Sequence, residues 1–161
     1  MTAPKGNELR DLLPEDAIST PKLLNGQGFQ LRPSRVKVYK PTGAPAYFYD
    51  VVTDSNTRVG IANLILEKDS QQVSEIGHVC ARLSEDQDSM ELLKQVAELL
   101  ISHGHECGLT EIRVVVPEQS EKSVKVCESI SKICNKAYLD RNGERFVWFE
   151  YSANGTSEQT A

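Results

Sequence analysis

The order of hydrophobic and polar residues predicts strands in the first half of the chain. Apolar and polar side chains alternate in some segments, and β-branched and aromatic residues cluster in others, both of which are typical of strands. Polar turns separate the segments, which are expected at 35–40, 47–52, 58–67 and 73–83. Together they predict an antiparallel meander of about four strands.

The hydrophobic period changes after residue 83. From Met90 to Ile101 apolar residues recur at helical spacing, and the serines and acids of 84–89 provide N-caps that suit the helix dipole. The most apolar segment, 109–116, then predicts a strand. Because a long helix separates it from the strand at 73–83, we expect these two strands to be parallel neighbours joined by a right-handed crossover.

A second helix and a hairpin complete the ordered part. Apolar residues at helical spacing predict the helix at 120–134. Segments 137–140 and 145–151 flank Asn142-Gly143, a dipeptide typical of a hairpin turn.

These elements predict one domain at 29–151, of the α+β class, with a largely antiparallel mixed sheet and flanking helices. Before it, residues 1–28 are broken by prolines and predict an irregular arm with at most a helical turn. After it, residues 152–161 lack large apolar side chains and predict a disordered tail.

Composition narrows the function classes. The 161 residues include 23 acidic and 18 basic ones, and the net charge of −5 argues against nonspecific nucleic-acid binding. Apolar runs fall short of the roughly 20 residues of a membrane helix. The first residues contain no apolar signal-peptide segment, so we expect a cytoplasmic protein whose four cysteines are free thiols.

Four segments, in this order and spacing, resemble the GNAT acyltransferase family. Thr57-Arg-Val-Gly-Ile-Ala-Asn-Leu resembles its "vGxixL" strand, and Ile76-Gly-His-Val resembles the "GHIGY" start of its cofactor strand. The segments 108–116 and 117–128 are similar to the strand, loop and helix that follow. The resemblance covers 46–151 and implies a GNAT-like acyl-CoA N-acyltransferase fold.

The resemblance also implies an activity and a cofactor. Such enzymes move an acetyl or other acyl group from acyl-CoA to an amine, carried by a small molecule or a protein. Acetyl-CoA would enter between the strands 73–83 and 109–116, and its pantetheine arm would pair with the backbone near Arg82 and Leu83. Ser123 agrees with the family pattern on the second helix and completes the implied cofactor-binding residues.

His78 falls where many family members carry a glutamate that acts as the base, and a histidine titrating near neutrality suits that task. The family's helix-borne tyrosine acid falls on Cys127, which leaves Tyr138 as the nearest candidate acid. The competing interpretation is that His78 is an ordinary strand histidine, hydrogen-bonded to a backbone carbonyl. This interpretation is favoured because such histidines are more common than catalytic ones.

The pyrophosphate loop departs from the family pattern. The arginine and two glycines of "RGxG" fall on Asp88, Ser89 and Glu91. Carboxylates repel the cofactor's phosphates by about 1–4 kcal/mol for each pair at ~4 Å, and a side chain obstructs the close approach that glycine permits. The alternative is therefore a non-catalytic GNAT-like protein whose acidic segment 84–91 binds a basic protein partner.

Two further groups have ordinary interpretations. His103, His105 and Cys107 carry metal-ligating atoms, but no second ligand cluster accompanies them, so a helix end with a surface loop is expected and no metal site. Cys127 and Cys134 share a helical face and are expected in the core, with a nucleophilic role as the less favoured reading.

Overall fold

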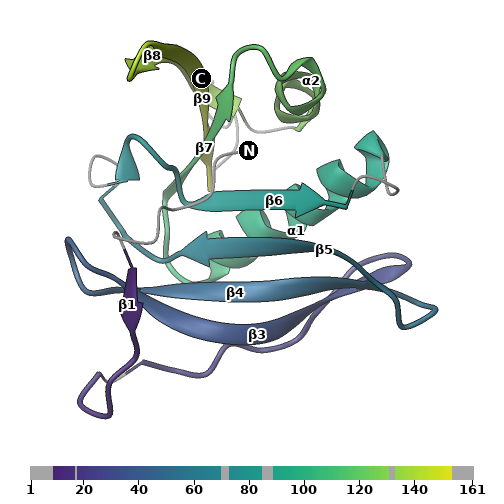
Figure 1. Cartoon of the computed structure of the whole chain (residues 1–161), viewed down its shortest axis with the longest axis vertical. Helices are drawn as coiled ribbons and strands as arrows, with labels where there is room; N and C mark the ends of the chain where they lie inside the picture. The colour runs from purple at the N-terminus through teal and green to yellow at the C-terminus, as the bar shows by residue number, and fades with distance from the viewer. Residues whose placement is uncertain (1–8, 17, 70–72, 85–88, 131–132, 154–161) are drawn as a thin grey trace.

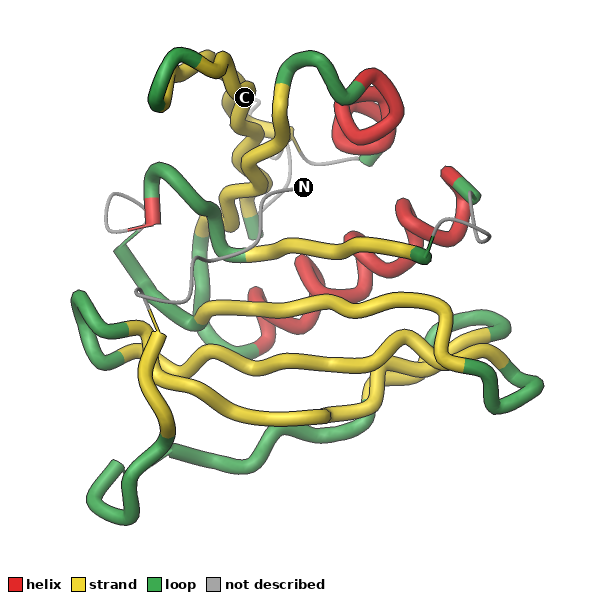
Figure 2. Tube along the Cα trace, viewed as in Figure 1, coloured by secondary structure: helices red, strands yellow, loops and turns green. Residues whose placement is uncertain are grey.

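The computed structural model describes residues 9–16, 18–69, 73–84, 89–130 and 133–153. In these ranges the chain forms two antiparallel sheets and two helices, an α+β arrangement (Figure 1). The larger sheet has helix α1 across its rear face in this view, and the smaller sheet stands at one end of it with helix α2 beside it (Figures 1 and 2).

The larger sheet contains the meander expected from sequence alternation. Its strands pair in the order β1-β3-β4-β5-β6, and β2 also pairs with β3. Their bounds are β1 (Leu9–Asp11), β2 (Leu24–Asn25), β3 (Phe29–Tyr39), β4 (Ala44–Thr53), β5 (Arg58–Ile65) and β6 (Val79–Leu83).

The smaller sheet has the order β7-β9-β8. Its strands are β7 (Glu111–Pro117), β8 (Ile133–Arg141) and β9 (Glu144–Ser152), and the helices are α1 (Met90–Glu106) and α2 (Glu121–Ser129). The β8–β9 turn holds Asn142 at φ 54° and Gly143 at φ 84°, the left-handed conformations that an Asn-Gly hairpin turn requires. The expected hairpin is therefore confirmed.

Three expected elements have different bounds. In the N-terminal arm, Leu9–Asp11 pairs with β3 as a strand where a helical turn was considered, because the edge of β3 offers backbone partners. Of the expected strand at 73–83, only β6 is a strand. The expected helix at 120–134 ends at Ser129, whose hydroxyl donates to the Val126 carbonyl at 2.7 Å.

The parallel strand pair expected from 73–83 and 109–116 is not found in the described part of the chain. β6 and β7 belong to different sheets, and Gly77 and Val114 form an isolated antiparallel bridge just before β6 begins. At this point the His78 carbonyl accepts from the Ile65 N–H of β5 at 2.8 Å, while its own N–H donates to the Arg113 carbonyl at 2.7 Å. The backbone of His78 thus forms hydrogen bonds to strands of both sheets.

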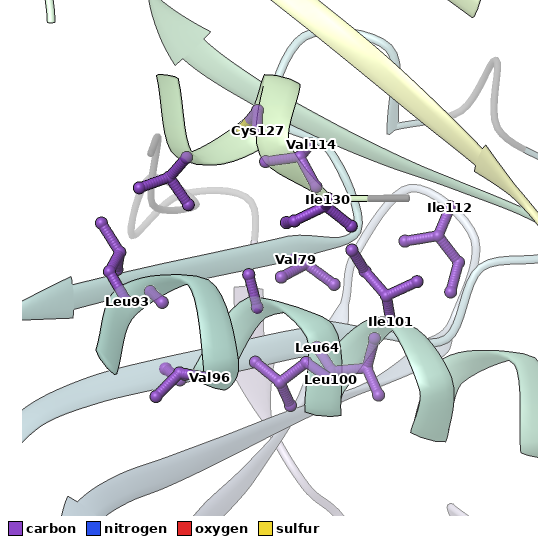
Figure 3. Close-up of a cluster of buried hydrophobic side chains, with 14 of the residues drawn as sticks. Leu64, Val79, Leu93, Val96, Leu100, Ile101, Ile112, Val114, Cys127 and Ile130 are labelled. Carbon is purple, nitrogen blue, oxygen red and sulfur yellow. The ribbon is translucent and has the colours of Figure 1, made fainter. Parts of the chain in front are cut away.

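One apolar cluster joins both sheets to both helices. Figure 3 shows Ile101 of α1 on the side of Val79 of β6 and Ile112 of β7, and Leu100 beside Leu64 of β5. Val79 and Val114 belong to the same cluster, together with Ile130 just after α2. The core therefore lies between α1 and the junction of β6 with β7. Its packing fixes the position of β6 relative to β7.

Candidate functional site

His78 lies at the junction of the two sheets and is fully buried, with 0% of its surface exposed. Its Nε2 lies 2.8 Å from the Glu67 carbonyl oxygen, so Nε2 carries the hydrogen and donates. Its Nδ1 then accepts from the Arg113 backbone N–H at 2.9 Å. Burial lowers the pKa of the ring to about 4. The imidazole is neutral at pH 7, with both nitrogens bonded to backbone groups.

This geometry bears on the expectation that His78 is a general base. A base needs a free lone pair within reach of the proton it abstracts. The Nδ1 lone pair already accepts the Arg113 N–H, and the ring has no exposed surface. His78 as the base stays a prediction. The hydrogen bonds around the ring are those of the competing interpretation, in which the histidine is bonded to backbone groups.

Beside His78, a buried ion pair ties β7 to β9. Arg113 donates from Nε at 3.1 Å and from Nη2 at 2.8 Å to one carboxylate oxygen of Glu150. The guanidinium carbon lies 3.9 Å from the centre of the Trp148 ring. Both charged side chains are buried, so each is stable there because the other is present.

The implied cofactor-binding residues of β6 differ in orientation. Ser84 and His78 both bond to β5, so alternation along the antiparallel pair turns the Arg82 backbone toward Ile61. The same alternation turns the backbone groups of Val79 and Leu83 away from β5, to the side where β7 diverges. Of the two residues that the resemblance implied, Leu83 has its backbone groups directed away from β5, toward the other edge of β6.

The Arg82 side chain is exposed beside a shallow hollow of about 210 Å³ over β5 and β6. The hollow is lined by Arg58, Val59, Gly60, Ile61, Arg82, Leu83 and Ser84. At Gly60 a side chain would be obstructed, because an added Cβ would lie 2.5 Å from the Arg82 carbonyl oxygen.

The buried residues of α2 are Ser123, Val126 and Cys127, and the last two belong to the apolar cluster. Cys127 has 0% exposure, and burial raises the pKa of its thiol to about 11. It lies in the cluster with Val79 and Val114 in Figure 3. The Tyr151 hydroxyl donates to the Cys127 carbonyl at 2.8 Å, which ties α2 to β9. Ser123 is 8% exposed on the same helix.

Tyr138 is not brought close to His78. It lies on β8, which β9 separates from β7, so about 10 Å of sheet lies between β8 and β7, the strand to which His78 bonds. Its side chain is 49% exposed, and the Arg145 guanidinium carbon lies 4.4 Å from its ring centre. Tyr138 as the acid remains a prediction.

Helix α1 begins where the sequence resemblance places the family's phosphate-binding loop. Ser89 caps it, and its hydroxyl accepts from the Leu92 N–H at 3.1 Å. Glu91 is exposed in the first turn and accepts from the Gln95 side chain at 3.0 Å. The predicted repulsion at Asp88 concerns 85–88, which lie outside the described residues. Ser89 and Glu91 place a hydroxyl and a carboxylate at this helix start.

The segment 103–107 is the last turn and cap of α1 and not a surface loop. His103 lies 3.3 Å from a Glu106 carboxylate oxygen and 3.6 Å from the Cys107 sulfur. Within the described ranges, three or more His, Cys, Asp or Glu side chains do not gather in a way that could hold a metal ion. Cys80, Cys107 and Cys127 are free thiols.

Sequence reasoning missed the partners of His78. Gly77 has φ +78°, and an added Cβ would lie 2.8 Å from the Arg113 carbonyl oxygen, so the chain passes β7 too closely for a side chain. In the sequence, Arg113 is a charged residue inside the most apolar segment. Trp148 and Glu150 are two positions apart on β9 and therefore share a face of that strand. A buried charge needs a partner, which was the available signal.

No family model and no curated protein matches the sequence. The structure, however, resembles solved acetyltransferases. A protein from Bordetella pertussis assigned to the GnaT family of acetyltransferases superposes with a TM-score of 0.53 at 14% identity, over 66% of each chain. The chain has the GNAT fold.

A chimera of the spermidine N-acetyltransferase SpeG from Vibrio cholerae and hSSAT gives a TM-score of 0.54 at 11% identity, over 68% of this chain and 70% of the chimera. An Acinetobacter baylyi protein assigned as an acetyltransferase gives 0.52 at 10% identity, over 70% and 67%. The chain thus spans about two thirds of each of these GNAT-fold proteins. Within its described residues, no helix is long and apolar enough to cross a membrane.

Proposed function

We propose that this GNAT-fold chain is an N-acyltransferase that moves an acetyl or other acyl group from acyl-CoA to an amine. The observation that carries the proposal is the divergence of β6 from β7, with the backbone of Val79 and Leu83 turned away from β5. A strand edge of this kind offers N–H and C=O groups to the amide groups of a pantetheine arm. The acetyltransferases that share the fold support it.

In the proposed reaction the amine nitrogen attacks the thioester carbonyl carbon, the carbon–sulfur bond breaks, and CoA leaves as a thiolate that takes up the proton lost by the amine. Leu83 would pair with the pantetheine through its backbone, and Arg82 and Ser123 would contact the cofactor from β6 and α2. The acceptor is an amine on a small molecule or a protein. The resemblance assigns the base to His78 and the acid to Tyr138, although both ring nitrogens of His78 are already bonded to backbone groups.

A second candidate is a non-catalytic GNAT-fold protein that binds a basic protein partner through its acidic segment 84–91. Two observations favour it. At the start of α1, Ser89 already takes up the Leu92 N–H, and Glu91 places a charge that repels phosphate. At the position of the family's acid, Cys127 is buried with a raised pKa.

Calorimetric titration of the full chain with acetyl-CoA separates the two candidates. The acyltransferase predicts saturable binding with a Kd of micromolar order, followed by acetyl transfer when an amine such as spermidine is added. Absence of binding at millimolar acetyl-CoA would rule out the enzyme and leave the binding protein.

A double variant tests the electrostatic obstacle. Asp88→Arg with Glu91→Gly removes repulsion and bulk at the start of α1, and we expect the affinity for acetyl-CoA to rise at least about tenfold, which corresponds to ~1.4 kcal/mol. The control, Asp54→Arg with Asp69→Gly, makes the same charge change in turns after β4 and β5. An equal rise in both would show that net charge, and not this helix start, controls binding.

A further inference from the structure

We propose that His78 is a positioning residue, the joint that fixes how β6 diverges from β7 and thereby sets the angle between the two sheets. The effect on acyl-CoA binding rests on the proposed function, whereas the joint itself does not. The proposal assigns to the imidazole a role in holding strands and not in moving protons.

The ring takes the place of a backbone carbonyl. In an antiparallel pair, two facing residues exchange both of their N–H···O bonds. His78 donates its N–H to the Arg113 carbonyl at 2.7 Å, but its own carbonyl already accepts from Ile65 on β5 at 2.8 Å. The Arg113 N–H therefore donates to the His78 Nδ1 at 2.9 Å. This substitution lets one residue bond to both sheets at once.

The other ring nitrogen fixes the orientation of the joint. Nε2–H donates to the Glu67 carbonyl at 2.8 Å, which sets the tautomer that leaves Nδ1 as an acceptor. Gly77 lets the backbone approach β7, since an added Cβ would lie 2.8 Å from the Arg113 carbonyl oxygen. The ring is thus held from the segment after β5 and cannot turn without losing a bond.

The β7 side of the joint is also held. The Arg113 side chain donates twice to Glu150 on β9 and stacks on Trp148 at 3.9 Å. These contacts fix the position of the Arg113 backbone that His78 bonds. Beyond the joint, Val79 and Leu83 turn their backbone groups away from β5, so the divergence of the sheets begins at His78.

Amide hydrogen exchange on three variants of the full chain tests the joint. His78→Asn places an amide oxygen near the Nδ1 position, so it retains an acceptor for the Arg113 N–H. His78→Gln reaches toward the Nε2 position and keeps a donor for Glu67, and His78→Leu keeps neither. We expect exchange at the Arg113 amide to be within about tenfold of wild type in His78→Asn, and at least about tenfold faster in His78→Gln and His78→Leu.

His105→Asn is the matched control, because the His105 ring bonds locally to the Leu109 carbonyl at the end of α1. It should leave Arg113 exchange unchanged. Equal Arg113 exchange in the wild type and all three His78 variants would overturn the proposal.

Nitrogen NMR of the wild type tests the same point without any substitution. We expect His78 to show the Nε2–H tautomer and no titration between about pH 5.5 and 8, because both nitrogens are committed to backbone partners. A ring that titrates near 6.5 would overturn the proposal. This readout remains decisive if a variant fails to fold.

Kinetics separate positioning from catalysis. If His78 is a positioning residue, His78→Leu should raise KM for acetyl-CoA more than His78→Asn does. The shape of the pH profile of kcat should stay the same. A base predicts an equal loss of kcat in all three variants and the loss of an inflection near neutrality, which would overturn the proposal. If wild type does not bind acetyl-CoA, the proposed function fails, while amide exchange still reports on the joint.

Discussion

At the scale of a residue, burial gives His78 an acid-dependent contribution to stability. Its pKa is lowered from 6.5 to about 4 in the folded chain, chiefly by burial. As the pH falls below 6.5 the unfolded state therefore binds the proton first, and the free energy of unfolding falls by about 3 kcal/mol between pH 6.5 and pH 4. Urea denaturation at pH 7, 5.5 and 4.5 measures the change.

His78→Asn provides the comparison for this prediction, because asparagine does not titrate. The variant should lose less stability than wild type over the same pH window. If the two lost stability equally, the acid sensitivity would come from other groups. The sequence placed His78 within a strand at 73–83, whereas the structure places it just before β6. The number of its backbone bonds depends on Glu67 and Arg113, which are brought to it by folding.

At the scale of an element, the N-cap of α1 makes a measurable contribution to the free energy of unfolding. The sequence offered several N-caps in 84–89, and the structure uses Ser89, whose hydroxyl accepts the Leu92 N–H. Ser89→Ala leaves that N–H without its partner, and we expect a loss of about 1 kcal/mol in the free energy of unfolding. Chemical denaturation of the full chain at pH 7 checks it.

The control for the cap is Ser102→Ala, an exposed serine inside the same helix. Alanine has the higher helix propensity, so this change should be neutral or slightly stabilising. Equal losses at both positions would contradict a capping role for Ser89.

Element types were predictable, whereas some boundaries were not. Alternation gave the meander and helical spacing gave α1, because these patterns record which side of an element is buried. The end of α2 at Ser129 and the start of β6 at Val79 depend on side-chain and cross-sheet hydrogen bonds. Such bonds do not recur at a regular spacing. The sequence pattern therefore extended the second helix beyond Ser129 and began the strand before Val79.

At the scale of the molecule, the shared core predicts that the two sheets unfold together. Trp148 on β9, the chain's single tryptophan, reports on the smaller sheet, and far-ultraviolet circular dichroism reports on all elements. Because one apolar cluster contains residues of both sheets, we expect the two probes to give the same urea midpoint. A lower midpoint for Trp148 fluorescence would show that the smaller sheet unfolds by itself.

The sequence by itself determined the α+β class, the hairpin at Asn142-Gly143 and the resemblance to the GNAT family, because local propensity and hydrophobic period are properties of neighbouring residues. It also located Glu91 at the start of α1. It wrongly predicted a parallel pair between 73–83 and 109–116, since a crossover argument cannot foresee that the two segments meet in an antiparallel bridge at Gly77 and Val114 and then belong to different sheets.

Only the tertiary structure decided what His78 contacts, how Arg113 pairs with Glu150, and which backbone groups of β6 are directed away from β5. The physical reason is that these contacts join residues about 10 to 40 positions apart. Burial removes water as a partner, so each polar group must find its partner within the fold. That requirement explains why both ring nitrogens of His78 are bonded to backbone groups of distant residues.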